Sequence, residues 1–407
     1  MSTGDIHLVL GISCSGKSTY IEHKIQSREW KDLPLLMAYE IDPESPDTIP
    51  DQECLVHYNL LRPFNNDASN INNNFLDDKV LAHLLKYKDR IKADLLVVHP
   101  DVLAKRVLLK TEVEGTLRET GTPYPQQEIF ELLCRLDTHE FYNRWISLLQ
   151  EYGIDAEIIN SETDEYSAIK SQAELAEYIN SEKNISYTDP EIKGIIDCND
   201  FEYQKIELPN NQFTQGDDRS PSLALLDQDL TGKSLLDIGC AYGYFCFEAE
   251  KRHASRVVGT ELKRHRFTGA NIIKQITGAK SQILFEDVFE SPPREKFDHV
   301  LLLNVIHHLK EPVRALRVIA GFCNEKLIIE FPTLADSKFH STLPAPASFD
   351  SSLPIIGVSL QGETDQTFLF SPQALERILL DHDSLFSKIE FMKSPMNPER
   401  SVAICYK

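Results

Sequence analysis

The hydrophobic positions fall into short apolar runs that alternate with longer segments in which apolar residues recur every three or four positions. In the first half, apolar runs predict strands at Ile6–Leu10, Leu35–Ile41, Cys54–Tyr58, Leu95–Val98 and Ala156–Ile159. Helical spacing lies between and after them, at Ser18–Gln26, Asp77–Arg90, Val102–Glu119, Gln126–Tyr152 and Tyr166–Asn180. Strands that alternate with helices of this length predict a parallel sheet covered on both faces.

A second alternating series follows a polar, weakly patterned stretch. Its apolar runs predict strands at Leu235–Ile238, Val257–Thr260, Gln282–Phe285, His299–Asn304 and Lys326–Glu330. A helix at Pro372–Leu380 and two further strands, Lys388–Met392 and Val402–Tyr406, close the series, and we expect these last strands to be antiparallel. At 407 residues the chain is long for one core. We therefore predict an α/β protein with domains at 1–182 and 201–407, joined by a linker at 183–200.

Composition narrows the class of protein. Hydrophobic residues make up 42% and charged residues 26% of the chain, and no run approaches the roughly 18 apolar residues of a membrane span. We expect a cytoplasmic protein. The eight cysteines form no CxxC pair, which disfavours a disulfide framework or a structural zinc site. The formal charge of −21 disfavours broad nucleic-acid binding and favours a small or neutral acceptor such as a glycan.

The segment from Gly11 to Ser18 fits the phosphate-loop pattern GxxxxGK[ST] between a predicted strand and a predicted helix. Glycines let the loop curl so that backbone N–H groups face a phosphate, and the helix N-terminus adds positive potential. We predict that Lys17 reaches the β- and γ-phosphates of ATP and that Ser18 ligates Mg²⁺. The remaining predicted contacts to the nucleotide come from Gly11, Ser13, Ser15, Gly16 and Thr19.

This first domain resembles the small P-loop kinases that phosphorylate metabolites. The resemblance implies a lid whose arginines stabilise the transferred phosphoryl group, for which Arg106 and Arg118 are the candidates. A solvated basic helix face explains these residues equally well. Glu40 and Asp42, after the second strand, are candidates for the catalytic carboxylates. No clean Walker B run is present, so the other magnesium ligands stay open.

A second glycine loop, LLDIGCAYGY at 235–244, resembles motif I of the class I S-adenosylmethionine (SAM) methyltransferases. The strand ends at a glycine so that the turn can approach a cofactor closely. The third glycine of a dinucleotide-binding loop is missing, which disfavours NAD. The predicted cofactor contacts in the loop are Asp237, Gly239, Cys240, Ala241 and Gly243.

Three downstream positions support this resemblance. Glu261 ends the next predicted strand, where the family places a carboxylate that accepts both ribose hydroxyls, and Asp287 lies where it places a group near adenine. The segment FDHVLLLNVIHHL resembles the family's fourth-strand region and implies that Asn304 lines the methionine end. His307 is the candidate general base, although packing or cofactor contact explains it and His308 as well.

The stretch FEYQKIELPNNQFTQG at 201–216 resembles the segment that precedes motif I in methyltransferases related to the tRNA wobble-uridine carboxymethyl-transferring group. Gln204 stands where that group usually has His, and Gln215 where it usually has Pro. Because relatives with this segment act on varied acceptors, the resemblance does not name an acceptor.

Three functions remain open at this point. The leading one is a bifunctional enzyme whose kinase and methyltransferase domains modify one small molecule or glycan, for example with a methyl phosphate cap. The alternative is a methyltransferase for RNA or tRNA with an accessory kinase or regulatory NTPase domain. It requires a basic patch at the methyl site, for which Lys251–Arg252 and Lys263–Arg266 are the candidates. The third is a nucleotide sensor that regulates the methyltransferase.

Overall fold

The computed structural model describes residues 4–45, 48–110, 126–334, 336, 353–358 and 368–407. By its internal contacts the chain divides into two units, Met1–Ile195 and Ile196–Lys407. Each unit contains its own sheet, so the predicted α/β class with two sheets is confirmed. Within the described residues, no helix has the length and apolar character required to cross a membrane.

The first unit is built on a six-stranded sheet in the order β2-β3-β1-β4-β5-β6. Its first five strands pair in parallel, and β6 is antiparallel to β5. The strands are β1 (Ile6–Gly11), β2 (Leu35–Met37), β3 (Cys54–Asn59), β4 (Ile91–Val97), β5 (Ala156–Asn160) and β6 (Ser167–Ala168). The order places β1 between β3 and β4, so the loop after β1 leaves from the middle of the sheet.

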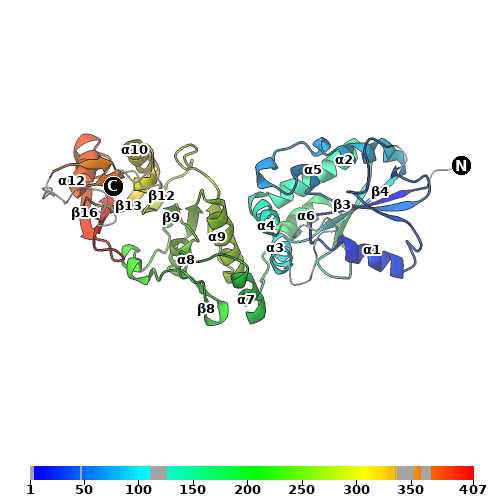
Figure 1. Cartoon of the computed structure of the whole chain (residues 1–407), viewed down its shortest axis with the longest axis horizontal. Coiled ribbons are helices and arrows are strands. Elements are labelled where there is room, and N and C mark those ends of the chain that lie inside the picture. Colours follow the sequence, from blue (N-terminus) through cyan, green and yellow to red (C-terminus); the bar gives the residue numbers. More distant parts are fainter. Residues whose placement is uncertain (1–3, 46–47, 111–125, 335, 337–352, 359–367) are drawn as a thin grey trace. The chain divides into compact units, whose positions relative to one another are not determined.

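Helices connect these strands and lie on both sides of the sheet, with α2 and α5 on one side and α1 on the other (Figure 1). Their bounds are α1 (Lys17–Gln26), α2 (Lys79–Leu84), α3 (Pro100–Leu109), α4 (Gln126–Arg135), α5 (Thr138–Glu151), α6 (Gln172–Asn180) and α7 (Asp189–Asp197). The aromatic residues Phe75 and Trp145 stack with 4.4 Å between ring centroids and help to pack the helical side of the core.

Several predicted boundaries were wrong for local reasons. The strand expected at Leu35–Ile41 ends at Met37, because the Glu40 carboxylate accepts the Met37 N–H and closes a turn. The helix expected at Gln126–Tyr152 is two helices, because Asp137 caps a new helix by accepting the Glu140 N–H. The segment expected as a linker at 183–200 contains helix α7.

The second unit has a seven-stranded sheet in the order β11-β10-β9-β12-β13-β17-β16. The predicted arrangement is confirmed, because five parallel strands are followed by an antiparallel pair. The strands are β9 (Ser234–Ile238), β10 (Arg256–Thr260), β11 (Gln282–Leu284), β12 (Phe297–Leu303), β13 (Cys323–Pro332), β16 (Lys388–Lys393) and β17 (Arg400–Tyr406).

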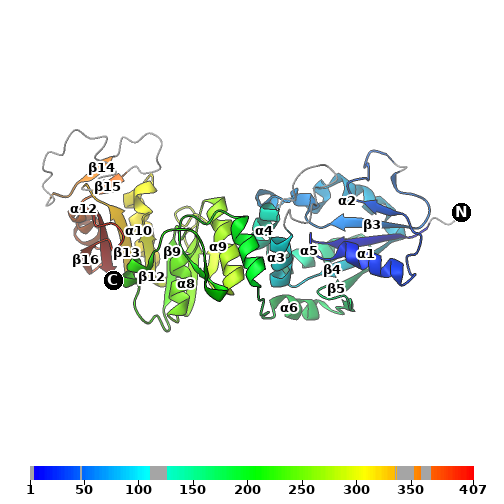
Figure 2. The same ribbon diagram turned by 60° about the horizontal axis from the view of Figure 1, so that its bottom comes forward.

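Among the residues that the structure describes, four α-helices and two short pairs of strands complete this unit. The helices are α8 (Tyr244–Lys251), α9 (Arg264–Thr277), α10 (Pro312–Phe322) and α12 (Pro372–Glu376), and the short strands are β7 (Glu207–Leu208), β8 (Gln212–Phe213), β14 (Ile356–Val358) and β15 (Phe368–Phe370). Figure 2 shows α8 and α9 beside β9, and α10 beside β12 and β13. Val300, Leu327 and Ala403 are fully buried at the centre of the sheet.

Candidate functional site

The phosphate-loop segment lies between β1 and α1, as the sequence predicts. Gly16 is the N-cap of α1 with φ 87° and ψ 20°, a left-handed conformation that a side chain disfavours. The loop closes on itself, because the Ser15 N–H donates to the Ile12 carbonyl at 3.0 Å and the Tyr20 N–H donates to Gly16 at 2.9 Å. The first turn of α1 therefore opens directly at the loop.

Lys17 is buried inside this loop. Its Nζ donates to the carbonyls of Gly11 and Ile12, at 2.9 Å each, and only 5% of the residue is exposed. Burial lowers the pKa of Lys17 to about 7, and the nearby positive charge of Lys110 lowers it further. An anion in the loop would offer the ammonium a better partner than two neutral carbonyls.

The loop is held by side chains from neighbouring strand ends. Asn59, at the end of β3, donates to the Ser13 hydroxyl at 2.9 Å, and the Ser161 hydroxyl, just after β5, donates to the Ser15 carbonyl at 2.7 Å. In the same strand as Asn59, burial and the charge of Lys17 lower the pKa of His57 to about 3. Sequence reasoning missed Ser161, whose only signal is that it follows a strand at the carboxyl edge of the sheet.

Arg106 of α3 reaches the same loop. Its guanidinium donates to the Cys14 carbonyl at 3.4 Å and to the Glu162 carbonyl at 2.7 Å. The structure thus brings Arg106 to Lys17's loop, whereas Arg118 lies outside the described residues.

The predicted metal ligand and carboxylates are placed differently. Ser18 and Thr19 are exposed in the first turn of α1. Glu40 and Asp42 are exposed and serve the turns after edge strand β2, where Glu40 accepts the Met37 N–H at 2.7 Å and Asp42 the Glu44 N–H at 2.9 Å. Within the described part of the chain, no group of three or more His, Cys, Asp or Glu side chains is arranged to hold a metal. The magnesium role of Ser18 and the catalytic roles of Glu40 and Asp42 stay predictions.

The second glycine loop, between β9 and α8, forms one wall of a cavity of about 650 Å³. Gly239 has φ 74°, and a Cβ there would lie 2.6 Å from Val305 Cγ2. Gly243, the N-cap of α8, has φ 85°, and a Cβ there would lie 2.9 Å from the Phe247 ring. Both glycines are therefore needed to fold the loop itself, besides leaving room for a ligand.

The cavity brings together most of the residues predicted for the cofactor. Its lining includes Asp237, Gly239, Cys240, Ala241, Glu261, Asp287 and Asn304. Gly243 is absent from the lining and acts through the backbone of α8. A volume of this size is within the usual range of about 300–1,000 Å³ for small-molecule sites.

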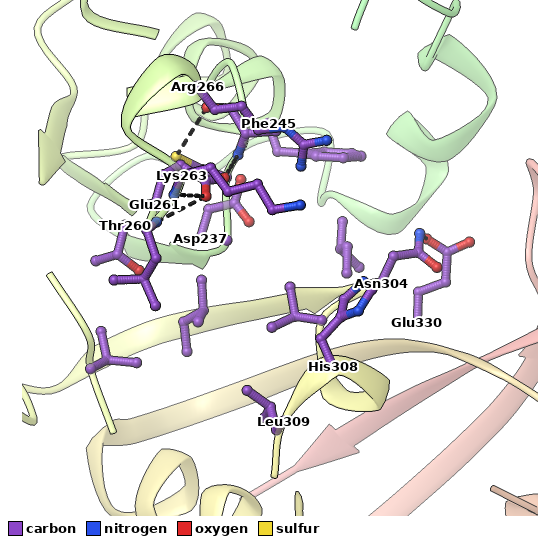
Figure 3. A pocket seen from close by; sticks show the side chains of 18 of the residues that line it. Asp237, Phe245, Thr260, Glu261, Lys263, Arg266, Asn304, His308, Leu309 and Glu330 are labelled. Carbon is purple, nitrogen blue, oxygen red and sulfur yellow. Dashed lines mark hydrogen bonds between the residues drawn. The ribbon is translucent and has the colours of Figure 1, made fainter. Parts of the chain in front are cut away.

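Glu261 is the clamp of this site (Figure 3). Its carboxylate accepts the backbone N–H groups of Ala241 at 3.0 Å, Leu262 at 2.9 Å and Lys263 at 2.8 Å, and only 6% of the residue is exposed. It thereby ties the end of β10 to the loop after β9.

Asp237 lies beneath the loop and is 2% exposed. Burial and the nearby charge of Glu261 raise the pKa of Asp237 to about 7. A cation bound in the cavity would favour the ionised form of this carboxyl group.

Asn304 directly follows β12, has φ 58° and belongs to a polar network that sequence reasoning missed. It donates to the Glu330 carboxylate at 2.5 Å and accepts from the Arg400 guanidinium, which also pairs with Asp336 at 3.1 Å. Figure 3 shows Asn304 and Glu330 side by side at the cavity. Glu330 lies near the end of β13, where it is opposite Val402 of β17, and Arg400, at the start of β17, is opposite Pro332, so the pairing of the two strands brings Glu330 and Arg400 together.

The two adjacent histidines have different surroundings. His307 is fully buried and is not part of the cavity lining, whereas His308 is exposed and lines the cavity. Their rings are 4.2 Å apart at the centroids in the short helix Ile306–His308. Of the two side chains, His308 therefore lines the cavity, and the role of His307 as the general base stays a prediction.

Gln204 is a further residue absent from the predicted site. Its side-chain oxygen accepts the N–H groups of Tyr242 at 3.0 Å and Tyr244 at 3.4 Å, and the residue is 5% exposed. It therefore caps the start of α8 from the segment that precedes β9. The only feature of the sequence that could have indicated this role is that Gln204 stands where the related methyltransferases usually have His.

Comparison with known proteins identifies the class of the second unit. Residues 217–383 match the family model described as a methyltransferase domain. This part of the chain is a class I SAM-dependent methyltransferase domain.

Individual proteins similar to this unit include several tRNA U34 carboxymethyltransferases. The chain is 32% identical over 99 residues to a tRNA U34 carboxymethyltransferase of Campylobacter hominis, covering 24% of this chain and 34% of that protein. It is 27% identical over 131 residues to a tRNA U34 carboxymethyltransferase of Campylobacter fetus, covering 31% of this chain and 46% of that protein. The chain thus spans less than half the length of these relatives. The solved structure of the N-terminal domain of EvdMO1 with SAH and D-fucose has a TM-score of 0.41 and 15% identity, over 54% of this chain and 97% of that one.

Proposed function

We propose that this protein is a SAM-dependent methyltransferase that acts on RNA and carries a nucleotide-binding domain in its first unit. The cavity supports the donor assignment, because a glycine loop, a clamped carboxylate and a buried acid meet there. The similarity to tRNA U34 carboxymethyltransferases favours RNA over the glycan acceptor that composition led us to expect.

One observation of this chain carries the RNA assignment. Of the two basic runs in the second unit, Lys263–Arg266 lies at the start of α9, and its members Lys263 and Arg266 line the cavity. Lys251 and Arg252 are not part of the cavity lining and form ion pairs with Glu248, at 2.9 Å and 3.0 Å. A basic patch at the cavity can attract a polyanion despite the acidic whole chain.

Methyl transfer to RNA tests this proposal. Purified protein is incubated with total RNA and labelled SAM, and label is expected in RNA with an affinity that falls as salt rises. Lys263→Glu should lower the RNA affinity several-fold, while Arg314→Glu, an exposed exchange on α10, should leave it unchanged. Label that enters only small molecules or glycans would overturn the RNA assignment. Mass spectrometry of the product distinguishes a methyl from a carboxymethyl group.

The bifunctional kinase and methyltransferase remains the second candidate, because the phosphate loop has its lysine buried in place and Arg106 against it. This candidate requires a phosphorylated acceptor. Methyl transfer that proceeds equally fast without ATP would contradict a sequence in which phosphorylation comes first. An effect of ATP on methyl transfer with no phosphorylated product would instead support a regulatory nucleotide site.

A further inference from the structure

Arg62 lies just after strand β3, beside the phosphate loop of the first unit. The last residue of β3, Asn59, is opposite Gly11 in the parallel pairing of β1 with β3 and donates to the Ser13 hydroxyl at 2.9 Å. The Leu60 N–H donates to the Gly11 carbonyl at 3.1 Å. Because α/β sheets bind ligands at the carboxyl ends of their parallel strands, Arg62 leaves the sheet at the edge that carries the nucleotide loop.

The guanidinium of Arg62 is held in place through its inner nitrogen. Nε donates to Asp78 Oδ2 at 3.0 Å, and Cζ lies 5.9 Å from the centroid of the Tyr58 ring. Asp78 is itself fixed, because it accepts the Tyr58 hydroxyl at 2.6 Å and the Val80 N–H at 3.0 Å, and its side chain is only 8% exposed. The orientation of the guanidinium is therefore set before a ligand binds, which lowers the entropy cost of binding.

The two outer nitrogens of Arg62 remain for a ligand. Among the described residues neither Nη1 nor Nη2 has an acceptor, and neither is buried, with 28% of the side chain exposed. Arg90 and Arg106 in the same unit differ, because their terminal nitrogens donate to backbone carbonyls. Nη1 and Nη2 form a planar fork that can donate to two oxygens of one phosphate group.

Arg62 and Arg106 flank the phosphate loop on opposite sides. The sheet order β3-β1-β4 places the loop after β1 between the end of β3, which leads to Arg62, and the end of β4, which leads to α3 and Arg106. Arg106 donates to the loop at the Cys14 carbonyl, and Lys17 lies inside the loop, so both can contact the phosphates of a bound nucleotide. Arg62 packs against Tyr58 of β3 instead, and is therefore placed for a molecule that approaches the loop from the β3 side.

We infer that Arg62 forms a second anion site beside the phosphate loop, which binds a phosphate group of the molecule that shares the first unit with the nucleotide. This inference rests on the proposed nucleotide-binding function of that unit and specifies the chemistry of the second molecule. Lys17 and Arg106 donate to carbonyls and pair with no carboxylate within the described residues. This edge therefore favours a phosphate, which carries close to two negative charges, over a singly charged carboxylate.

Inorganic phosphate tests the inference when the loop is saturated with a non-hydrolysable ATP analogue and Mg²⁺, because the analogue keeps phosphate out of the loop itself. Isothermal titration calorimetry at constant ionic strength should show saturable phosphate binding that Arg62→Ala weakens by about tenfold or more. The affinity for the analogue should change less than about twofold in this variant. Arg62→Lys, which keeps the charge without the fork of donors, should give an intermediate loss.

Arg28→Ala is the matched control, since it removes the same charge from an exposed position beyond the far end of α1. It should leave phosphate binding unchanged. Equal phosphate binding in Arg62→Ala and wild-type protein, or no saturable binding in the wild type, would overturn the inference. A parallel loss of phosphate and analogue in Arg62→Ala would show that Arg62 supports the fold of the loop, and would overturn it as well.

Two further outcomes keep the test decisive. Acetate that binds as tightly as phosphate would overturn the assignment of a phosphate group. If Arg62→Ala does not fold, the same comparison is made with Arg62→Gln. Wild-type protein that does not bind the ATP analogue would instead refute the nucleotide-binding proposal itself.

Discussion

The two glycine loops of this protein have nearly the same backbone at the helix start and opposite buried charges. Gly16 caps α1 with φ 87° and ψ 20°, and Gly243 caps α8 with φ 85° and ψ 16°. The first loop encloses the cation Lys17, and the second covers the acid Asp237. Burial moves the pKa of each group to about 7, downward for Lys17 and upward for Asp237. The backbone provides the turn, and the buried charge determines whether an anion or a cation is the better ligand.

The largest expected effect is a difference in stability loss when alanine replaces a glycine of each loop, because the added Cβ meets different neighbours. Gly239→Ala introduces a Cβ at positive φ and 2.6 Å from Val305, so we expect a loss of about 2–5 kcal/mol of unfolding free energy. Gly16→Ala meets nothing closer than 3.9 Å and should cost only about 1–2 kcal/mol. Differential scanning calorimetry measures the unfolding free energy of both variants. The transition whose midpoint rises when S-adenosylhomocysteine is added is assigned to the second unit. Adding Val305→Ala to Gly239→Ala should restore part of the loss, and a double variant no more stable than the single would contradict the proposed clash.

The second prediction concerns the buried cation. Lys17→Met should lower ATP affinity by about a hundredfold, because a charge-assisted hydrogen bond to phosphate is lost, while S-adenosylhomocysteine affinity stays unchanged. In wild-type protein the ATP affinity should fall as the pH rises above 7, because the pKa of free Lys17 is about 7 and the phosphate binds its protonated form. Titration calorimetry at several pH values checks both. An unchanged pH slope in Lys17→Met would assign the proton to another group.

The third prediction concerns the buried acid and has the opposite sign. Because the pKa of Asp237 rises from 3.8 in an unfolded chain to about 7 in the fold, ionisation destabilises the folded state. The unfolding free energy should therefore fall between pH 4 and 7, and this loss should be complete above pH 7. Asp237→Asn should lack that slope and be more stable above pH 7 by on the order of 1–3 kcal/mol, with weaker donor binding. Chemical denaturation across this pH range measures the slope, and the same slope in both proteins would refute the assignment.

The smallest effect is expected at the cap of α8. Gln204→Ala leaves the Tyr242 and Tyr244 N–H groups without their acceptor and should cost about 1 kcal/mol. The matched change in the first unit is Asn59→Ala, which removes a hydrogen bond to the Ser13 hydroxyl instead. Each change should weaken only the ligand of its own unit, as measured with S-adenosylhomocysteine and ATP. Crossed effects would show that the two sites are coupled.

Features that depend on neighbouring residues could be predicted from the sequence. The glycine loops and most of the strand segments follow from local pattern, and the structure places Glu261 and Asp287 at the cavity as expected. Patterns could not show that Glu40 is used to close a turn, because a carboxylate after a strand looks the same in either role.

Features that depend on distant residues could not be found. Glu330 and Arg400 reach Asn304 only because β13 pairs with β17, a contact between strands far apart in the chain. His307 and His308 are indistinguishable by residue type, and the turn of a short helix decides which of them faces the cavity.

The clamp formed by Glu261 has a consequence for donor analogues. A carboxylate has about four acceptor positions, and the N–H groups of Ala241, Leu262 and Lys263 occupy three of them. Leu262 and Lys263 both donate to Oε1, so the open position is on Oε2. We therefore expect Glu261 to accept one ribose hydroxyl while the loop stays closed. Of the 2′-deoxy and 3′-deoxy forms of the donor, only one should bind markedly more weakly than the parent molecule.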